Sequence, residues 1–137
     1  MDLRELINEL GRANPNLWGL SVYEIDSING TLKGSWTNTN KPSTLQNPII
    51  MNEIARKRNT PNNILGTYTT AYIESDNAES FLGTLTITIA ENNNGLYILN
   101  WDIIGNENDN NFGFSGVGMK TGVDQLTVFY WQLNPKK

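Results

Sequence analysis

Two reactive residue types are missing from this chain. Its 137 residues include no cysteine and no histidine. Without cysteine there are no disulfides, no thiol nucleophile and no Cys-based zinc site. Without histidine the chain lacks the commonest general base, the usual Ser–His catalytic pair and His metal ligands. No constellation of Asp, Glu, Tyr, Lys or Ser stands out as a replacement. We therefore expect a non-enzymatic protein with no metal and no cofactor.

Charge and long apolar runs are also scarce. Charged residues make up 18% of the chain and the net charge is −4, whereas a nucleic-acid footprint needs clustered Lys and Arg. The one basic cluster, Arg56 to Arg58, is interpreted as the end of a helix. No apolar run reaches the roughly 18 residues of a membrane helix, and the first residues are not a secretion signal. The sequence favours a cytoplasmic protein that has no membrane span and binds no nucleic acid. A secreted or periplasmic location stays open if a leader has been removed, and the oligomeric state is open.

Asn, Thr, Ser and Gly are abundant and favour strands joined by turns. Strand-like segments recur at regular intervals, and Asn29-Gly30 is a strong signal for a two-residue hairpin turn. We expect one mostly-β domain over residues 1–137, an antiparallel meander barrel or half-barrel of about seven to eight strands. The expected strands are a hairpin over 18–37 and single strands over 65–73, 81–90, 96–104, 112–119 and 125–133.

Two short helices are expected beside the strands. Residues 2–10 carry Leu3, Ile7 and Leu10 at helical spacing after Asp2, which is suited to an N-cap. A helix near 48–57 is predicted from Pro48 in its first turn, within an insertion over 38–64. Its Ile50 and Ile54 are expected to face the barrel, with Met51 as a further candidate.

Three segments contain residues of catalytic or binding type, but we interpret each as a structural feature and not as a functional site. The acidic residues between 74 and 79 fall on a polar turn, which offers no desolvation to a general acid. The loop 106–111 fails the ligand spacing of a calcium loop. The glycines at 113, 116 and 118 alternate within a strand, so they leave room for rings and do not form a phosphate loop.

Aromatic residues give the most informative pattern. Trp36, Tyr68, Trp101 and Trp131 all lie within or at the ends of expected strands. Tyr and Trp combine large apolar area with a polar group, which suits a cavity for a small organic ligand. The alternative is a barrel core packed solid with side chains.

Several patches resemble the calycin barrels, and the avidins in particular. Gly34 to Asn38 is similar to their Gly-x-Trp opening strand, and Gly66 to Ala71 to the avidin third strand. Short stretches around Phe81, Trp101 and Trp131 follow the order of later avidin strands. The loose strand motifs from Phe81 onward also resemble small bacterial lipocalin-like or half-barrel domains of unassigned role.

The avidin resemblance implies a set of ligand-binding residues. In that family polar groups bind the ureido head of biotin and tryptophans wall its ring. Carried over by position, the ligand-facing residues are Asn38, Tyr68, Thr70, Trp101 and Trp131.

This chain also departs from the avidin pattern. The insertion over 38–64 stands where an avidin has its short second strand, and Ile103 and Ile104 stand where serine and threonine contacts are expected. An avidin has one further strand after that of Trp131. The hairpin over 18–37 is a candidate to supply that strand from the front.

The sequence thus predicts binding of a small, partly apolar ligand in a barrel cavity. The alternative is a protein–protein interaction module of the inhibitor or immunity type. An apolar edge at 125–133 is an aggregation hazard, so we expect that strand to be paired in a closed barrel or buried in an oligomer.

Overall fold

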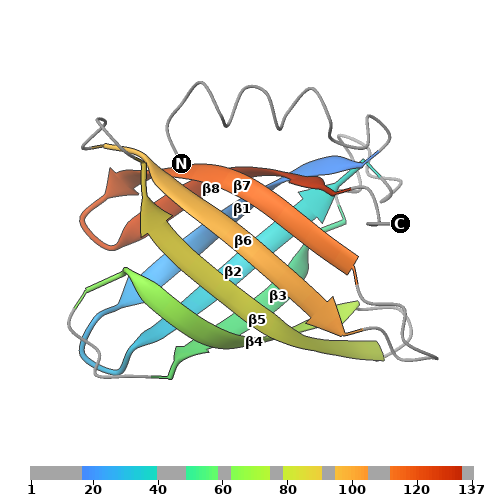
Figure 1. Ribbon diagram of the computed structural model, residues 1–137, viewed down its shortest axis with the longest axis horizontal. Helices are drawn as coiled ribbons and strands as arrows, with labels where there is room; N and C mark the ends of the chain where they lie inside the picture. The colour runs from blue at the N-terminus through green and yellow to red at the C-terminus, as the bar shows by residue number, and fades with distance from the viewer. Residues whose placement is uncertain are drawn as a thin grey trace.

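The structure is a computed structural model that describes residues 17–39, 49–58, 63–74, 79–90, 95–104 and 112–133. Eight antiparallel strands form a closed barrel in which every strand pairs with its sequence neighbours, and β1 pairs with β8 (Figure 1). The mostly-β barrel predicted from the sequence is confirmed. The strands are β1 (Trp18–Asp26), β2 (Thr31–Asn38), β3 (Met51–Lys57), β4 (Gly66–Glu74), β5 (Glu79–Ile89), β6 (Tyr97–Ile104), β7 (Phe112–Gly122) and β8 (Gln125–Gln132).

The barrel closes between the first and the last strand. Trp18 is paired with Trp131, and the pairing continues to Glu24 opposite Gln125. The 18–37 hairpin therefore does add a strand beside the strand of Trp131. Both edges of β8 are paired, as expected for so apolar a strand. Gly30 takes a φ of 66° in the β1–β2 turn, a conformation that glycine adopts at little cost.

The prediction of a helix near 48–57 is wrong. Residues Met51–Lys57 form strand β3, which pairs with β2 on one side and β4 on the other. Met, Glu, Ala, Arg and Lys favour helices locally, but pairing with strands on both sides outweighs that preference. Ile50 and Ile54 face outward, and their exposed fractions are 57% and 50%. The expected helix over 2–10 lies outside the described residues.

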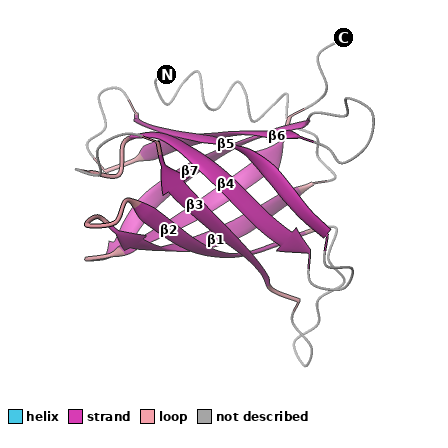
Figure 2. Ribbon diagram, turned by 90° about the horizontal axis from the view of Figure 1, so that it is seen from below, coloured by secondary structure: helices cyan, strands magenta, loops and turns pink. Residues whose placement is uncertain are grey.

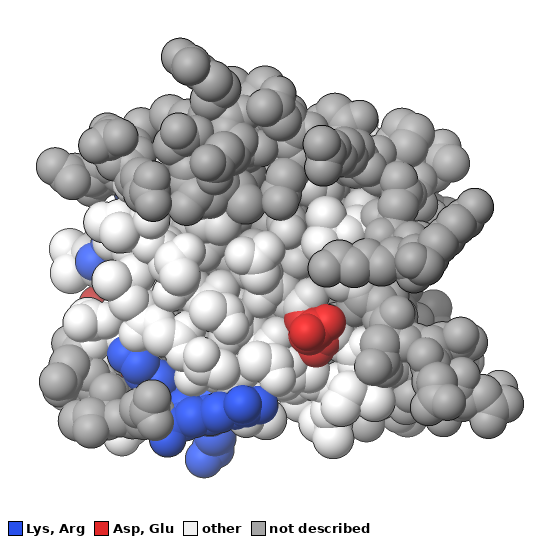
Figure 3. Space-filling view, viewed as in Figure 1, with Lys and Arg blue, Asp and Glu red and all other residues white. Residues whose placement is uncertain are grey.

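The basic cluster ends a strand, so its interpretation as a helix end is also wrong. Arg58 donates to the hydroxyls of Thr69 and Thr84 on the outer surface of β4 and β5. Lys57 Nζ donates to the carbonyl of Asn63. Figure 3 shows basic side chains gathered at one end of this face, while the rest of its described surface carries little charge.

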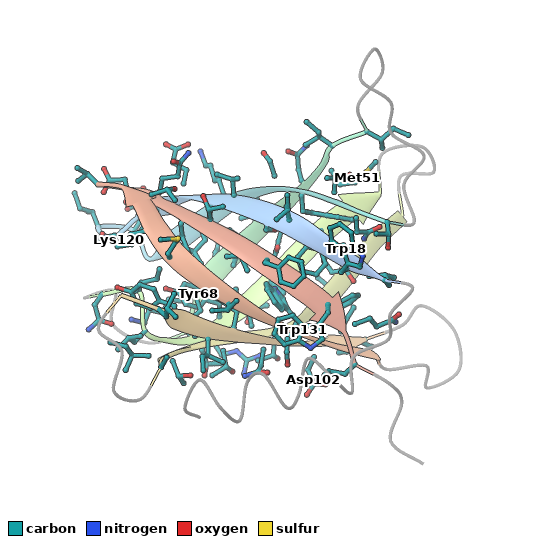
Figure 4. All side chains as sticks on the ribbon, turned by 90° about the horizontal axis from the view of Figure 1, so that it is seen from above. Trp18, Met51, Tyr68, Asp102, Lys120 and Trp131 are labelled. Atoms are coloured by element: carbon teal, nitrogen blue, oxygen red, sulfur yellow. The ribbon has the colours of Figure 1, made fainter. Side chains whose placement is uncertain are left out.

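Figure 2 shows the strands wrapped around the barrel, and their side chains alternate between the interior and the outer surface of the barrel (Figure 4). The Gly30 end of the barrel, where β1 turns into β2, is filled mainly with aliphatic side chains such as Leu99 and Leu126, both 0% exposed, beside the buried ring of Tyr68. Toward the Asn38 end, where β2 finishes, inward aromatic and polar side chains lie beside the apolar Met51 and Ile103. Trp101, Tyr130 and Glu53 keep 8%, 7% and 5% of their surface exposed. No helix within the described ranges is long and apolar enough to cross a membrane.

Candidate functional site in the barrel interior

A buried carboxylate is the centre of the polar half of the barrel. Glu53 lies between Met51 and Ala55 on the inward face of β3. Tyr23 donates a hydrogen bond of 2.5 Å to its Oε1, while Thr70 Oγ1 and Trp101 Nε1 donate to its Oε2, the second over 3.3 Å. Strands β1, β4 and β6 thus each contribute one neutral donor to a carboxylate held on β3.

Gly34 makes the contact between Tyr23 and Glu53 possible. It lies on β2, directly between its pairing partners Tyr23 on β1 and Glu53 on β3. A methyl group at this position would be 2.7 Å from Tyr23 Cε1. Because glycine has no side chain, the ring of Tyr23 lies against the barrel wall and its hydroxyl reaches the carboxylate.

A second polar contact lies at the Asn38 end. Asn38 Nδ2 donates to the Tyr130 hydroxyl over 3.3 Å, and that hydroxyl donates to the Thr37 carbonyl over 3.1 Å. The Tyr130 ring is 5.8 Å from the ring of Trp101, tilted by 59°. This ring pair connects Asn38 with the surroundings of Glu53.

Burial controls the ionisation of the interior groups. It raises the pKa of the Glu53 carboxyl, against the opposing effect of hydrogen bonds from Thr70, Tyr23 and Trp101. Burial, with the charge of Glu53, raises the pKa of Tyr23 well above its ordinary value. It also raises the pKa of Tyr68 to about 12, and that of Tyr130 further still. The tyrosines therefore remain hydrogen-bond donors at neutral pH.

The structure brings together part of the residue set predicted from the sequence. Thr70 and Trp101 meet at Glu53, and Asn38 joins them through Tyr130. Tyr68 is inward-facing, but its hydroxyl donates to the Ile64 carbonyl, away from the carboxylate.

Trp131 lies on the other side of the barrel wall. Tyr130 faces the interior, so the next residue along the strand faces outward, and Trp131 has its ring 5.9 Å from that of Phe129 on the outer face (Figure 4). Tyr130 therefore contributes the inward aromatic ring that the avidin resemblance had given to Trp131.

Sequence reasoning missed Glu53, Tyr23 and Tyr130. The signal for Glu53 was present in the alternation of Met51, Glu53 and Ala55, but it disappears once the segment is assigned to a helix. Tyr23 was recognised within a strand, yet its side of the barrel depends on the register with Gly34. In the part of the chain that the structure describes, no three Asp or Glu side chains are grouped as metal ligands.

In comparisons with known proteins, no protein-family model matched the chain, and no curated protein or solved structure matched it at a significant level.

Proposed function

We propose that the protein binds a small, partly apolar ligand inside the barrel, at its Asn38 end, and catalyses no reaction. The observation that carries the proposal is the division of the interior. Mainly aliphatic side chains, with the ring of Tyr68 among them, close the Gly30 end, whereas Trp101, Tyr130 and Glu53 bring two rings and a carboxylate together toward the Asn38 end, each more than 90% buried. Rings for burial and a few polar groups for orientation are the usual composition of a ligand site.

The architecture supports the same proposal. A closed eight-stranded antiparallel barrel is compatible with a calycin-type protein. The resemblance of the strand patches to avidins and to lipocalin-like domains adds support for a ligand in the interior. We propose that Asn38, Thr70 and Trp101 belong to the site, together with Glu53 and Tyr130.

Biotin itself is not the ligand that this arrangement favours. The Thr70 hydroxyl and the Trp101 indole already donate to Glu53. A ureido oxygen bound as in the avidins would have to compete with an internal carboxylate for those donors. We therefore expect a ligand whose polar group is complementary to the carboxylate.

Indole NMR signals offer a direct test. A thermal-shift screen with biotin, fatty acids, haem and a fragment set would select compounds for titration of the ¹⁵N-labelled protein. We expect a binder to shift the indole signal of Trp101, inside the barrel, and to leave that of Trp18, which is 46% exposed on the outer face, unchanged. A barrel whose interior signals respond to no compound would contradict the proposal.

A second candidate function is favoured by the outer face of β1. Trp18, Leu20 and Val22 alternate on that face and are 46%, 49% and 36% exposed, and Leu20 pairs with Phe129 of β8. Such an apolar stripe suits a protein partner, and the net charge of −4 favours a basic one. Recovery of one basic protein by the wild type but not by Leu20→Asp would support this function, whereas equal recovery would argue against it.

A further inference from the structure

The negative charge of Glu53 has no cationic partner in the described part of the barrel. It is the one acidic side chain that is buried there. The described basic side chains lie elsewhere: Lys33, Arg56, Arg58 and Lys120 are exposed, and Lys57 is bound to the Asn63 carbonyl. Three neutral donors satisfy hydrogen bonds but leave the net charge uncompensated, and a buried uncompensated charge is costly.

One acceptor position of the carboxylate remains open. An ionised carboxylate has about four lone-pair sites on its two oxygens. Oε2 accepts from Thr70 and Trp101, while Oε1 accepts from Tyr23 alone. A ligand that brought one further N–H to Oε1 would complete the set. An anionic ligand would be repelled, since the donors suited to it already bind Glu53.

Aromatic rings surround this carboxylate. Trp101 and Tyr130 form a tilted pair at 5.8 Å, and Trp36 and Tyr72 form an edge-to-face pair at 5.6 Å. Tyr72 is the pairing partner of Glu53 on β4. Ring faces attract cations and also bury the apolar body of a ligand.

We propose that the ligand is an organic amine, with its ammonium group bound to Glu53 Oε1 and its apolar part packed against Trp101 and Tyr130. This inference rests on the proposed ligand-binding function and specifies its ligand class. The carboxylate has the charge opposite to that of the ammonium group, and its free lone pair on Oε1 orients that group. The two rings bury the apolar part of the ligand.

Three probes of nearly one shape test the charge preference: 2-phenylethylamine, 2-phenylethanol and 3-phenylpropionate, each titrated into the wild-type protein by calorimetry. Because a charge-assisted hydrogen bond is about twice as strong as a neutral one, we expect the amine to bind at least about tenfold more tightly than the alcohol. We expect the propionate to be weakest. In Glu53→Gln the preference for the amine should disappear, and in Asp102→Asn, which changes an exposed carboxylate, it should persist.

A pH series on the wild type gives a second readout if Glu53→Gln does not fold. A proton competes with the ligand cation for Glu53, so the affinity for the amine should fall on acidification while that for the alcohol stays constant. Among the residues that the structure describes, the other titratable groups facing Glu53 are Tyr23 from β1, Tyr72 from β4 and Tyr130 from β8. Tyrosines ordinarily ionise near pH 10, outside the range of this experiment.

The outcomes separate the two proposals. Preference for the amine, lost in Glu53→Gln or on acidification, supports the ligand class. Equal binding of all three probes, with a shift of the Trp101 indole signal, would overturn the amine inference and leave the ligand-binding function standing. Absence of binding by every probe, together with an unresponsive interior in the fragment screen, would overturn both.

Discussion

Tyr23 and Glu53 meet across a strand to which neither belongs: the hydroxyl on β1 donates over 2.5 Å to the carboxylate on β3, above Gly34 of the intervening strand β2. The contact depends on a missing side chain in the middle strand, so it can be disturbed without altering either partner. It also places the most polar group of the interior in the part of the barrel that we propose as the ligand site.

Substitution of Gly34 by Ala should destabilise the protein. The added methyl group would lie 2.7 Å from Tyr23 Cε1 and force the ring away from the wall. Overpacking of this kind typically costs about 1–3 kcal/mol, measurable as a lower free energy of unfolding in urea. Gly95→Ala is the control, because no atom lies within 4 Å of its added methyl. Equal stability of the two variants would contradict the packing described for Tyr23.

The pH dependence of stability should reveal Glu53. Burial raises the pKa of this carboxyl, so the folded protein keeps the proton to a higher pH than the unfolded chain does. The contribution of this protonated carboxyl to the free energy of unfolding is therefore fully present below the ordinary carboxyl pKa. It is lost as pH rises through the raised pKa of Glu53. The free energy of unfolding of the wild type, relative to Glu53→Gln, should therefore fall over an interval that begins near the ordinary carboxyl pKa. A rise over that interval would mean that the three hydrogen bonds outweigh burial.

Alkaline pH should act through the buried tyrosines. Burial raises the pKa of Tyr68 to about 12, above the value of about 10 expected in the unfolded chain. Its contribution to stability is present below pH 10 and is lost as pH rises toward 12. Tyr68→Phe should lose less stability over this interval, after a fixed cost of about 1 kcal/mol for the hydrogen bond to Ile64. Phenolate absorbance and urea unfolding at each pH measure the two effects, and identical alkaline profiles would count against this assignment.

The position of β1 in the chain should be exchangeable. Gln132 N donates to the Leu17 carbonyl over 3.1 Å, so the end of β8 lies beside the beginning of β1. A permuted chain that opens at the turn before Gly30 and carries residues 1–27 after residue 137, through a flexible linker, should form the same barrel. Its circular dichroism and cooperative unfolding should match the wild type, with lower stability from the new linker. A non-cooperative transition would show that the hairpin connection itself is required.

The sequence was sufficient for most of the barrel because most strands alternate clearly. Leu85 and Ile87 face inward with Thr84 and Thr86 on the opposite face, as expected from a period of two. The signal of Asn29-Gly30 likewise placed the hairpin correctly, although the connection between Asp26 and Thr31 has four residues, 27–30, and not the expected two. These are local properties, and local properties are what a single sequence reports well.

The failures have a common cause in long-range pairing. The segment of Glu53 has strong helix formers and becomes a strand only because β2 and β4 lie on either side of it. In β8, two large aromatic residues follow each other, and only the register with β1 and β7 decides that Tyr130 faces inward and Trp131 outward. Because Glu53 was assigned to a helix, the residue that organises the candidate site was absent from the predicted set.

The pairing of Trp18 with Trp131 also has a kinetic consequence. The two residues are more than 100 positions apart, so β1 can pair with β8 only after this last strand has been synthesised. Until then the hairpin of β1 and β2 has an edge, with Trp18, Leu20 and Val22 beside it, that finds no partner within its own chain. Contacts of such sequence separation slow folding and prolong the exposure of unpaired strands. Newly made chains should therefore depend on this edge of β1 being covered until β8 has been made. Crowding or high expression should lead to pairing of β1 with a strand of another chain.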